Sequence, residues 1–237
     1  MSTTTTTTSN MEGSRAANLK CAQEKATSLF DEIARTLIRP GIYESQLSKE
    51  IHVLGSERHG VRTHWHKRVV RSGPNTLQPY VSNPPDRLIE EDDILFVDLG
   101  PVFEAWEADF GRAFVLGSDP LKTRLRDSLE PTWKAVKTYF DSNRQTITGE
   151  QLYAYACSEA RKAGFEFGGA HSGHLVGDFP HERIPNDKIH LYITEGNKDA
   201  MWSVDAKGNQ RHWILEMHLL DREREIGGFM EQLLTVD

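Results

Sequence analysis

The placement of acidic residues inside two apolar, β-rich segments constrains the fold of this chain more than any other feature. The first segment reads ILFVDLGPVFEAWEADFGRAFVLG, and its Asp98 and Asp109 are 11 positions apart around a turn predicted between Phe103 and Glu104. A hairpin folded at that turn sets the two carboxylates opposite each other on neighbouring strands. Like charges opposite each other on buried strands destabilise a sheet unless protons or cations compensate for them.

The segment WILEMHLLDREREIGGFMEQLLTV repeats this arrangement near the end of the sequence. Glu216 and Glu231 are equidistant from a turn predicted between Glu223 and Arg224, so we expect them to face each other as well. Either pair alone is equally compatible with carboxylates on the solvent face of amphipathic strands. Two pairs, each inside an apolar strand, favour bound metal that balances the charge.

A glycine- and histidine-rich segment, GGAHSGHLVGDFPHE, offers imidazole groups to accompany these carboxylates. It contains His171, His174 and His181, and imidazole is the usual partner of carboxylates at a hydrolytic metal site. A lone histidine is more often a structural residue, so the three gain meaning only from the acidic hairpins.

The remaining pattern predicts one α+β domain in which helices cover the outer face of an antiparallel sheet. Residues 1–13 are Thr-rich with little to bury, so we expect a disordered tail there and a single domain over residues 14–237. Apolar spacing and capping residues predict helices over 15–39, 44–54 (closed by Gly55), 119–140 and 148–164. Strands are predicted in both hairpins and in two further segments, residues 68–73 and 189–195.

Composition excludes several classes of protein. Twenty-eight basic and 35 acidic residues give a net charge of −7, which argues against nucleic acid or an anionic membrane as a partner. No apolar run is long enough to span a bilayer as a helix. The start of the sequence lacks the features of a secretory signal, and Cys21 and Cys157 cannot form a disulfide framework. We therefore expect a cytoplasmic protein.

Taken together, the motifs resemble peptidase family M24, which includes methionine aminopeptidase, aminopeptidase P and prolidase. The matching pieces are VDLGP, ADFGRAF, GHLVG and the two late glutamates, and the resemblance as a whole spans about residues 15–237. The resemblance implies the pita-bread fold, and the catalytic domain alone. It also implies a centre for two divalent ions, drawn from Mn, Fe, Co or Zn. The implied ligands are Asp98 for one ion, His174 and Glu216 for the other, and Asp109 and Glu231 bridging both.

The activity implied by the resemblance is hydrolysis, by a metal-activated water, of an amide bond near the amino terminus of a short peptide, with Xaa-Pro peptides favoured. Glu216 would move the proton of the water, and His181 would hydrogen-bond the substrate carbonyl. Tyr80 stands where family peptidases have a histidine that contacts the amide, and Met217 and Phe229 also depart from the family pattern. These departures leave two interpretations: a hydrolase with an altered substrate pocket, or a relative with a retained metal site and non-peptide C–N chemistry or a binding role.

Three histidines, His64, His66 and His171, are candidates for binding the substrate, which would be a small peptide or amide. On a strand, His64 and His66 would share one face. They are then either a surface feature or part of the substrate cleft, where they would stand in for the histidine that Tyr80 replaces. The sequence allows a homodimer without predicting one.

Overall fold

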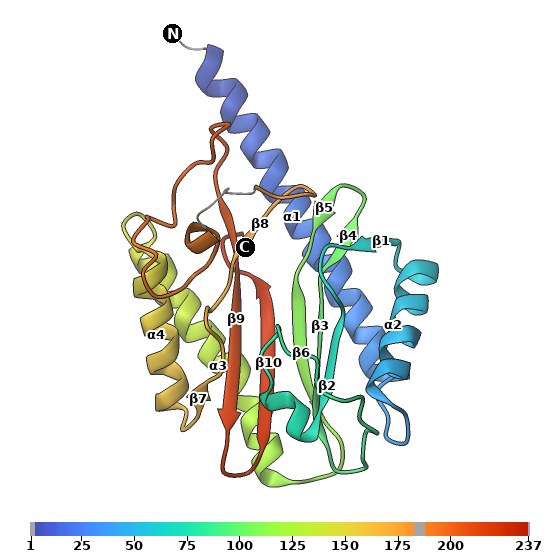
Figure 1. The fold of residues 1–237 in the computed structure, drawn as a ribbon. Coiled ribbons are helices and arrows are strands. Elements are labelled where there is room, and N and C mark those ends of the chain that lie inside the picture. Colours follow the sequence, from blue (N-terminus) through green and yellow to red (C-terminus); the bar gives the residue numbers. More distant parts are fainter. Residues whose placement is uncertain (1–2, 183–187, 237) are drawn as a thin grey trace.

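A seven-stranded antiparallel sheet forms the centre of the protein (Figure 1). The structure is a computed structural model that describes the backbone of residues 3–182 and 188–236, with side chains described over 11–182 and 189–236. The strands are β1 Val61–His64, β2 Val69–Ser72, β3 Ile94–Leu99, β4 Pro101–Phe103, β5 Trp106–Glu107, β6 Phe110–Val115, β7 Glu166–Phe167, β8 Leu175–Val176, β9 His212–Asp221 and β10 Ile226–Leu233. The order in the large sheet is β2-β3-β6-β10-β9-β7, with β8 paired to β9, while β1, β4 and β5 form a small second sheet.

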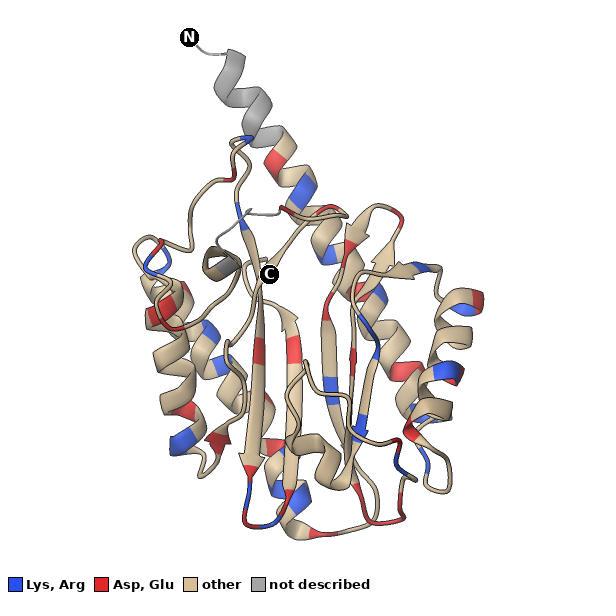
Figure 2. Ribbon diagram, in the orientation of Figure 1, with Lys and Arg blue, Asp and Glu red and all other residues tan. Residues whose placement is uncertain are grey.

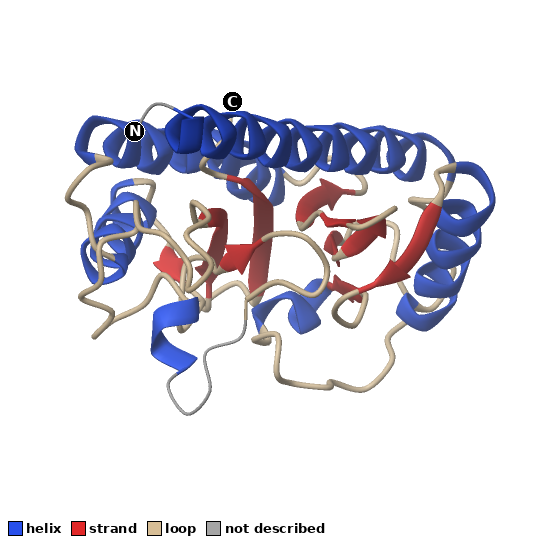
Figure 3. Cartoon of the chain, turned by 90° about the horizontal axis from the view of Figure 1, so that it is seen from above, coloured by secondary structure: helices blue, strands red, loops and turns tan. Residues whose placement is uncertain are grey.

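Over residues 3–182 and 188–236, four α-helices accompany the sheet, and the long first helix runs along one face of the strands (Figure 3). They are α1 Thr3–Thr36, α2 Glu44–Arg58, α3 Pro120–Asn143 and α4 Gly149–Lys162, with 3₁₀ turns η1 Gly73–Leu77 and η2 Lys188–Leu191. Within the described part of the chain, no helix is long and apolar enough to cross a bilayer. The predicted α+β architecture, with antiparallel strands and helices on the outer face, is confirmed.

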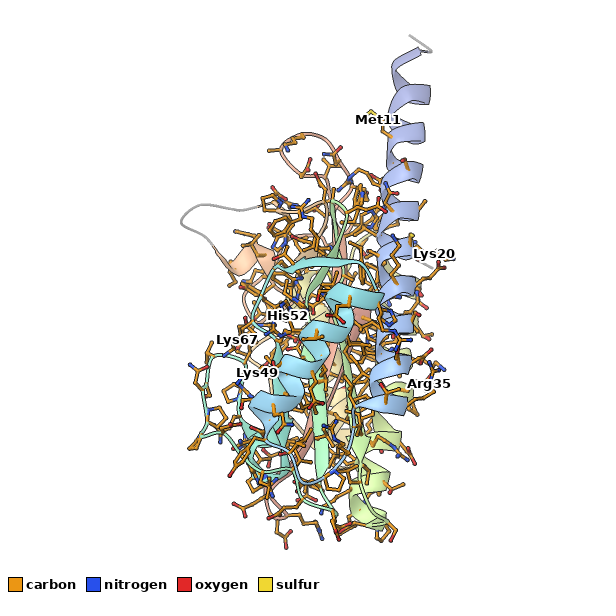
Figure 4. All side chains as sticks on the ribbon, turned by 90° about the vertical axis from the view of Figure 1, so that its right-hand side faces the viewer. Met11, Lys20, Arg35, Lys49, His52 and Lys67 are labelled. Carbon is orange, nitrogen blue, oxygen red and sulfur yellow. The ribbon has the colours of Figure 1, made fainter. Side chains whose placement is uncertain are left out.

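Helix α1 packs on the sheet through an apolar stripe at helical spacing. Ala26, Leu29 and Ile33 are fully buried in one core cluster with residues of β3 and β6. Lys20 and Arg35 lie on the opposite side of the helix, which faces away from the sheet (Figure 4). Apolar burial on one stripe therefore fixes which face of α1 covers the sheet.

The second helical pair, α3 and α4, covers β9 and β10. Asp119 caps α3 by accepting hydrogen bonds from the backbone N–H groups of Leu121, at 2.7 Å, and Lys122, at 3.2 Å. Thr148 and Gln151 form a capping box at the start of α4. Both predicted starts are therefore confirmed, and α3 continues through Pro131 to Asn143.

Strand alternation separates the acidic residues from the helices. Val97 and Leu99 lie in the core cluster shared with α1 and α2, so Asp98 between them points to the other face of the sheet. Leu215 and Met217 lie in the cluster shared with α3 and α4, and the glutamate between them also points away from the helices. The acidic residues thus gather on the face that the helices leave uncovered.

Two sequence-based element predictions are wrong. Helix α2 does not close at Gly55 but runs to Arg58. Gly55 is buried inside the helix, where a β-carbon would lie 3.2 Å from Val61, so this glycine allows close packing instead of ending the helix. Residues 189–195 are not a strand: η2 is followed by a loop with one isolated bridge, from Tyr192 to His174. Of residues 189–195, only Ile193 is fully buried. The apolar pattern of this segment therefore does not mark the buried face of a strand.

The predicted tail over residues 1–13 stays a prediction. Helix α1 is assigned from Thr3, while residues 1–2 and the side chains up to residue 10 lie outside the described part of the structure. Near the end of this segment, the Glu12 carboxylate lies 2.8 Å from His212 Nε2 on β9, and Arg15 Nη1 donates to the carbonyl of Gln210 at 2.9 Å. Described contacts with the domain therefore begin at about residue 12.

Candidate metal centre

Acidic residues from three strands lie at one level across the sheet. In the pairing register Asp98 of β3 lies opposite Gly111 of β6, Gly111 lies opposite Glu231 of β10, and Glu231 lies opposite Glu216 of β9. Figure 2 shows acidic positions on β3, β10 and β9 at the same height. The predicted pairing of Glu216 with Glu231 is confirmed, because the charged turn between β9 and β10 is centred where the sequence places it.

The register predicted for the first hairpin is wrong by two residues. Asp98 pairs with Gly111 and not with Asp109, because the turn is centred on Glu104 and Ala105, one residue later than predicted. Glu104 adopts a left-handed conformation there, with φ of 57°. A shift of two residues keeps the same face of a strand, so Asp109 still points toward the other acidic residues.

Asp109 lies at the centre of the cluster, with one histidine at each of its oxygens. Its Oδ2 is 3.0 Å from His174 Nε2, and its Oδ1 is 3.1 Å from His66 Nε2. His174 Nε2 is also 3.5 Å from Glu231 Oε1, and His66 Nε2 is 3.6 Å from Asp98 Oδ1. Potential ligand atoms of His66, Asp98 and Asp109 lie within 4.8 Å of one another, as do those of Asp109, His174 and Glu231. Asp109 is the residue that both groups share.

Three carboxylates of the cluster are buried. Asp98, Asp109 and Glu231 are 6%, 3% and 2% exposed. Burial, together with the neighbouring carboxylates, raises the pKa of Glu231 well above its usual range and that of Asp98 to about 7. Burial acts in the same direction on Asp109, but its two histidines outweigh it and lower the pKa of this carboxyl. Such an environment resists the ionised carboxylates unless cations balance them.

Glu216 lies beside this cluster and not inside it. Its carboxylate is in contact with Nδ1 of His171, whose ring is 4.6 Å from that of Tyr192. The structure thus pairs a predicted metal ligand with a predicted substrate-binding residue, although the two had separate roles in the sequence-based hypothesis.

His181 is held at the edge of the cluster by a residue that the sequence analysis missed. Its Nδ1 lies 2.7 Å from Glu107 Oε2, and its backbone N–H donates to Glu107 Oε1 at 3.2 Å. Glu107 is 1% exposed, and the His181 ring lies 5.3 Å from that of Trp65. The available signal was the position of Glu107 two residues before Asp109, which puts an acidic residue on the same face of an otherwise apolar strand.

The two remaining candidates occupy different surroundings. Tyr80 is 45% exposed, its ring is 5.7 Å from that of His66, and burial raises the pKa of its hydroxyl. His64 lies 6.1 Å, ring to ring, from His52 on α2, and burial lowers its pKa to about 4. The prediction that His64 and His66 share one face of a strand is wrong, because β1 ends at His64 and the chain turns before His66.

Comparison with known proteins assigns the family. The model of metallopeptidase family M24 matches residues 17–201, and the chain therefore belongs to this family. A Mycoplasma genitalium protein provisionally named an Xaa-Pro aminopeptidase is 25% identical over 169 residues, which are 70% of this chain and 47% of that protein. The chain thus spans about half the length of this curated relative.

Solved structures share the fold of this chain. A prolidase from Thermococcus sibiricus aligns with a TM-score of 0.73 at 20% identity, covering 92% of this chain and 55% of its own. An X-Pro aminopeptidase from Thermotoga maritima aligns with a TM-score of 0.74 at 19% identity, covering 96% and 62%. The predicted pita-bread fold is confirmed by these similarities.

Proposed function

We propose that this chain is a hydrolase with two divalent ions that cleaves an amide bond near the amino terminus of a short peptide, including Xaa-Pro peptides. Membership of a metallopeptidase family supports the class of activity. The names of the relatives, a prolidase and two Xaa-Pro aminopeptidases, support the class of substrate. The observation that carries the proposal is the convergence of three buried carboxylates on two histidines.

The residues present fit such a pair of ions. Asp98 Oδ1 is buried and has no hydrogen-bond partner among the described residues. A carboxylate oxygen is therefore left inside the protein without a hydrogen-bond donor from these residues. Carboxylate oxygens with imidazole nitrogen suit Mn, Fe, Co or Zn. The proposed ligands are the five that the family resemblance implies: Asp98, Asp109, His174, Glu216 and Glu231.

The surrounding residues then have separable tasks. When bound, a pair of divalent ions supplies Lewis acidity that activates water and polarises a carbonyl. Glu216, which lies beside the cluster in contact with His171, accepts the proton of the attacking water. Glu107 holds His181 through Nδ1, which leaves Nε2 to hydrogen-bond the substrate carbonyl. Tyr80, which is partly exposed, lies with its ring beside that of the buried His66.

A matched pair of glutamate variants tests the proposal. Glu231→Gln removes a buried ligand, whereas Glu223→Gln changes a carboxylate whose side chain is 86% exposed in the turn between β9 and β10. Elemental analysis and hydrolysis of proline-containing dipeptides should show loss of bound metal and of turnover in Glu231→Gln alone. Equal metal content and equal turnover in both variants would refute the proposed centre.

A second candidate function is favoured by Tyr80, which is a poor proton donor because its pKa is raised. A metal centre with this residue beside His66 suits a non-peptide C–N substrate or a binding role. The test is Tyr80→His assayed with a mixed set of dipeptides and simple amides. Peptidase activity gained by this variant, and absent from the metal-loaded wild type, would favour the second candidate.

A further inference from the structure

His66 occupies a position in the cluster that mirrors that of His174. The two histidines come from different parts of the chain, one from the connection between β1 and β2 and the other from the loop before β8. Each places Nε2 at one oxygen of Asp109, at 3.1 Å for His66 and 3.0 Å for His174. Each also reaches one further carboxylate, Asp98 for His66 and Glu231 for His174.

The other ring nitrogens repeat this symmetry. His66 Nδ1 is 2.6 Å from the carbonyl oxygen of Lys67, and His174 Nδ1 is 2.9 Å from that of Leu175, so each histidine uses the carbonyl of the next residue. A carbonyl oxygen only accepts, so Nδ1 must carry the hydrogen and donate it. In the neutral ring the lone pair then lies on Nε2, which faces the carboxylates. Histidines that bind metal are oriented by their second nitrogen in this way.

The connection that carries His66 is held in place by contacts of Trp65 and Gly100. The Trp65 backbone N–H donates to the carbonyl of Gly100 at 2.9 Å, and its indole Nε1 donates to the carbonyl of Ala108 at 3.1 Å. A β-carbon at Gly100 would lie 2.2 Å from His66 Cδ2, so this glycine permits the close approach. The side chain of His66 is only 8% exposed. These contacts direct the ring toward the cluster instead of toward solvent.

An unsatisfied acceptor lies directly in front of this ring. Asp98 Oδ1, which has no hydrogen-bond partner among the described residues, is 3.6 Å from His66 Nε2. We propose that His66 is a protein ligand of the ion held by Asp98, so that each of the two proposed ions would have its own imidazole. This inference rests on the dinuclear centre proposed above, and it replaces the substrate-binding role that the sequence suggested for His66.

A second imidazole changes which ions the centre prefers. The five ligands implied by the family resemblance include one imidazole nitrogen, that of His174. When His66 is added, each of the two ions has one imidazole nitrogen among its ligands. Imidazole suits Zn, Co and Fe better than Mn or Mg, which favour oxygen donors. The proposal therefore includes a preference for Zn²⁺ or Co²⁺ over Mn²⁺ at the ion held by Asp98.

Titration of metal-free protein with Co²⁺ tests this assignment without relying on activity. The variants are His66→Ala and His66→Gln, the second of which keeps a polar side chain in place if the first does not fold. His64→Ala is the matched control, because His64 is the last residue of β1, two positions before His66, and its ring lies beside that of His52 on α2. Calorimetry should show two bound ions in the wild type and in the control. In the His66 variants the affinity for one ion should fall at least about tenfold, and the visible absorption of bound Co²⁺ should change.

Two outcomes separate this inference from the function on which it rests. If the wild type binds two ions and His66→Gln binds both with unchanged affinity and an unchanged Co²⁺ spectrum, His66 is not a ligand and the dinuclear centre stands. Asp109→Asn should weaken both ions, because Asp109 belongs to both groups of ligand atoms. If the wild type itself fails to bind two ions, both the proposed centre and the role of His66 are overturned.

Discussion

Replacing Asp98 by asparagine should change stability in opposite directions with and without divalent metal. Burial raises the pKa of Asp98 from 3.8 to about 7, so the folded protein binds this proton more tightly than the unfolded chain does. The stabilisation from the bound proton is present below pH 3.8 and is lost as the pH rises through 7. At about 1.4 kcal/mol per pKa unit, the ionised carboxylate destabilises the metal-free fold by up to about 4 kcal/mol at pH 8.

Asparagine removes this electrostatic penalty, because it carries no charge at any of these pH values. Metal-free Asp98→Asn should therefore unfold at a higher urea concentration than the wild type at pH 8, and the difference should shrink toward pH 4. Metal reverses the order, because a ligand that binds only the folded state stabilises it by about 2.7 kcal/mol at a concentration 100 times its dissociation constant. The variant lacks one ligand of the metal, so bound metal stabilises its folded state less than that of the wild type.

The assay is urea unfolding followed by tryptophan fluorescence, with chelator or with saturating Zn²⁺. Asp31→Asn is the control, because Asp31 is an exposed carboxylate on α1 and should respond equally in both conditions. The reasoning fails if Asp98→Asn is less stable than the wild type with chelator as well as with metal. That result would mean that the carboxylate is held by protein contacts and not by a cation.

Three further changes test the fold around the centre. Burial lowers the pKa of His218 to about 4, so the unfolded state takes up the proton of this side chain first as the pH falls. The free energy of unfolding of the wild type should therefore drop by up to about 3 kcal/mol between pH 6.5 and 4. Urea unfolding of His218→Gln should lack this part of the drop. A β-carbon at Gly111 would lie 2.6 Å from the Phe229 ring and 3.2 Å from Glu231 Cβ, so Gly111→Ala should lower unfolding free energy by about 1–3 kcal/mol and weaken Co²⁺ binding measured by calorimetry. Thr148→Ala removes the cap of α4 and should lower stability by about 1 kcal/mol, seen as a fall of about 2–4 °C in the melting temperature with metal binding unchanged.

Local patterns in the sequence were sufficient to predict most elements of the fold. The helices that begin after Asp119 and Thr148 are capped by hydrogen bonds between the side chain of the capping residue and the backbone two or three residues later. The few residues around each start are therefore enough to predict it. The pairing of Glu216 with Glu231 was equally accessible, because a charged turn between two apolar runs fixes the register of both strands. The sequence also predicted that Asp98, Asp109, His174 and Glu231 belong to one site, and their side chains do converge.

Other features depended on contacts between distant segments. The strand pairing of the first hairpin differs from the prediction by two residues, with Glu104 in a left-handed conformation at the turn, and no residue type near the turn indicated this register. His66 is 43 positions from Asp109, and the contact exists because Gly100 and Trp65 bring the connection between β1 and β2 against the end of β3. Periodicity reports which face of a strand a residue occupies, but not which distant side chain meets it there. The sequence alone therefore determined the carboxylates and their common face, and only tertiary packing decided that a second imidazole joins them.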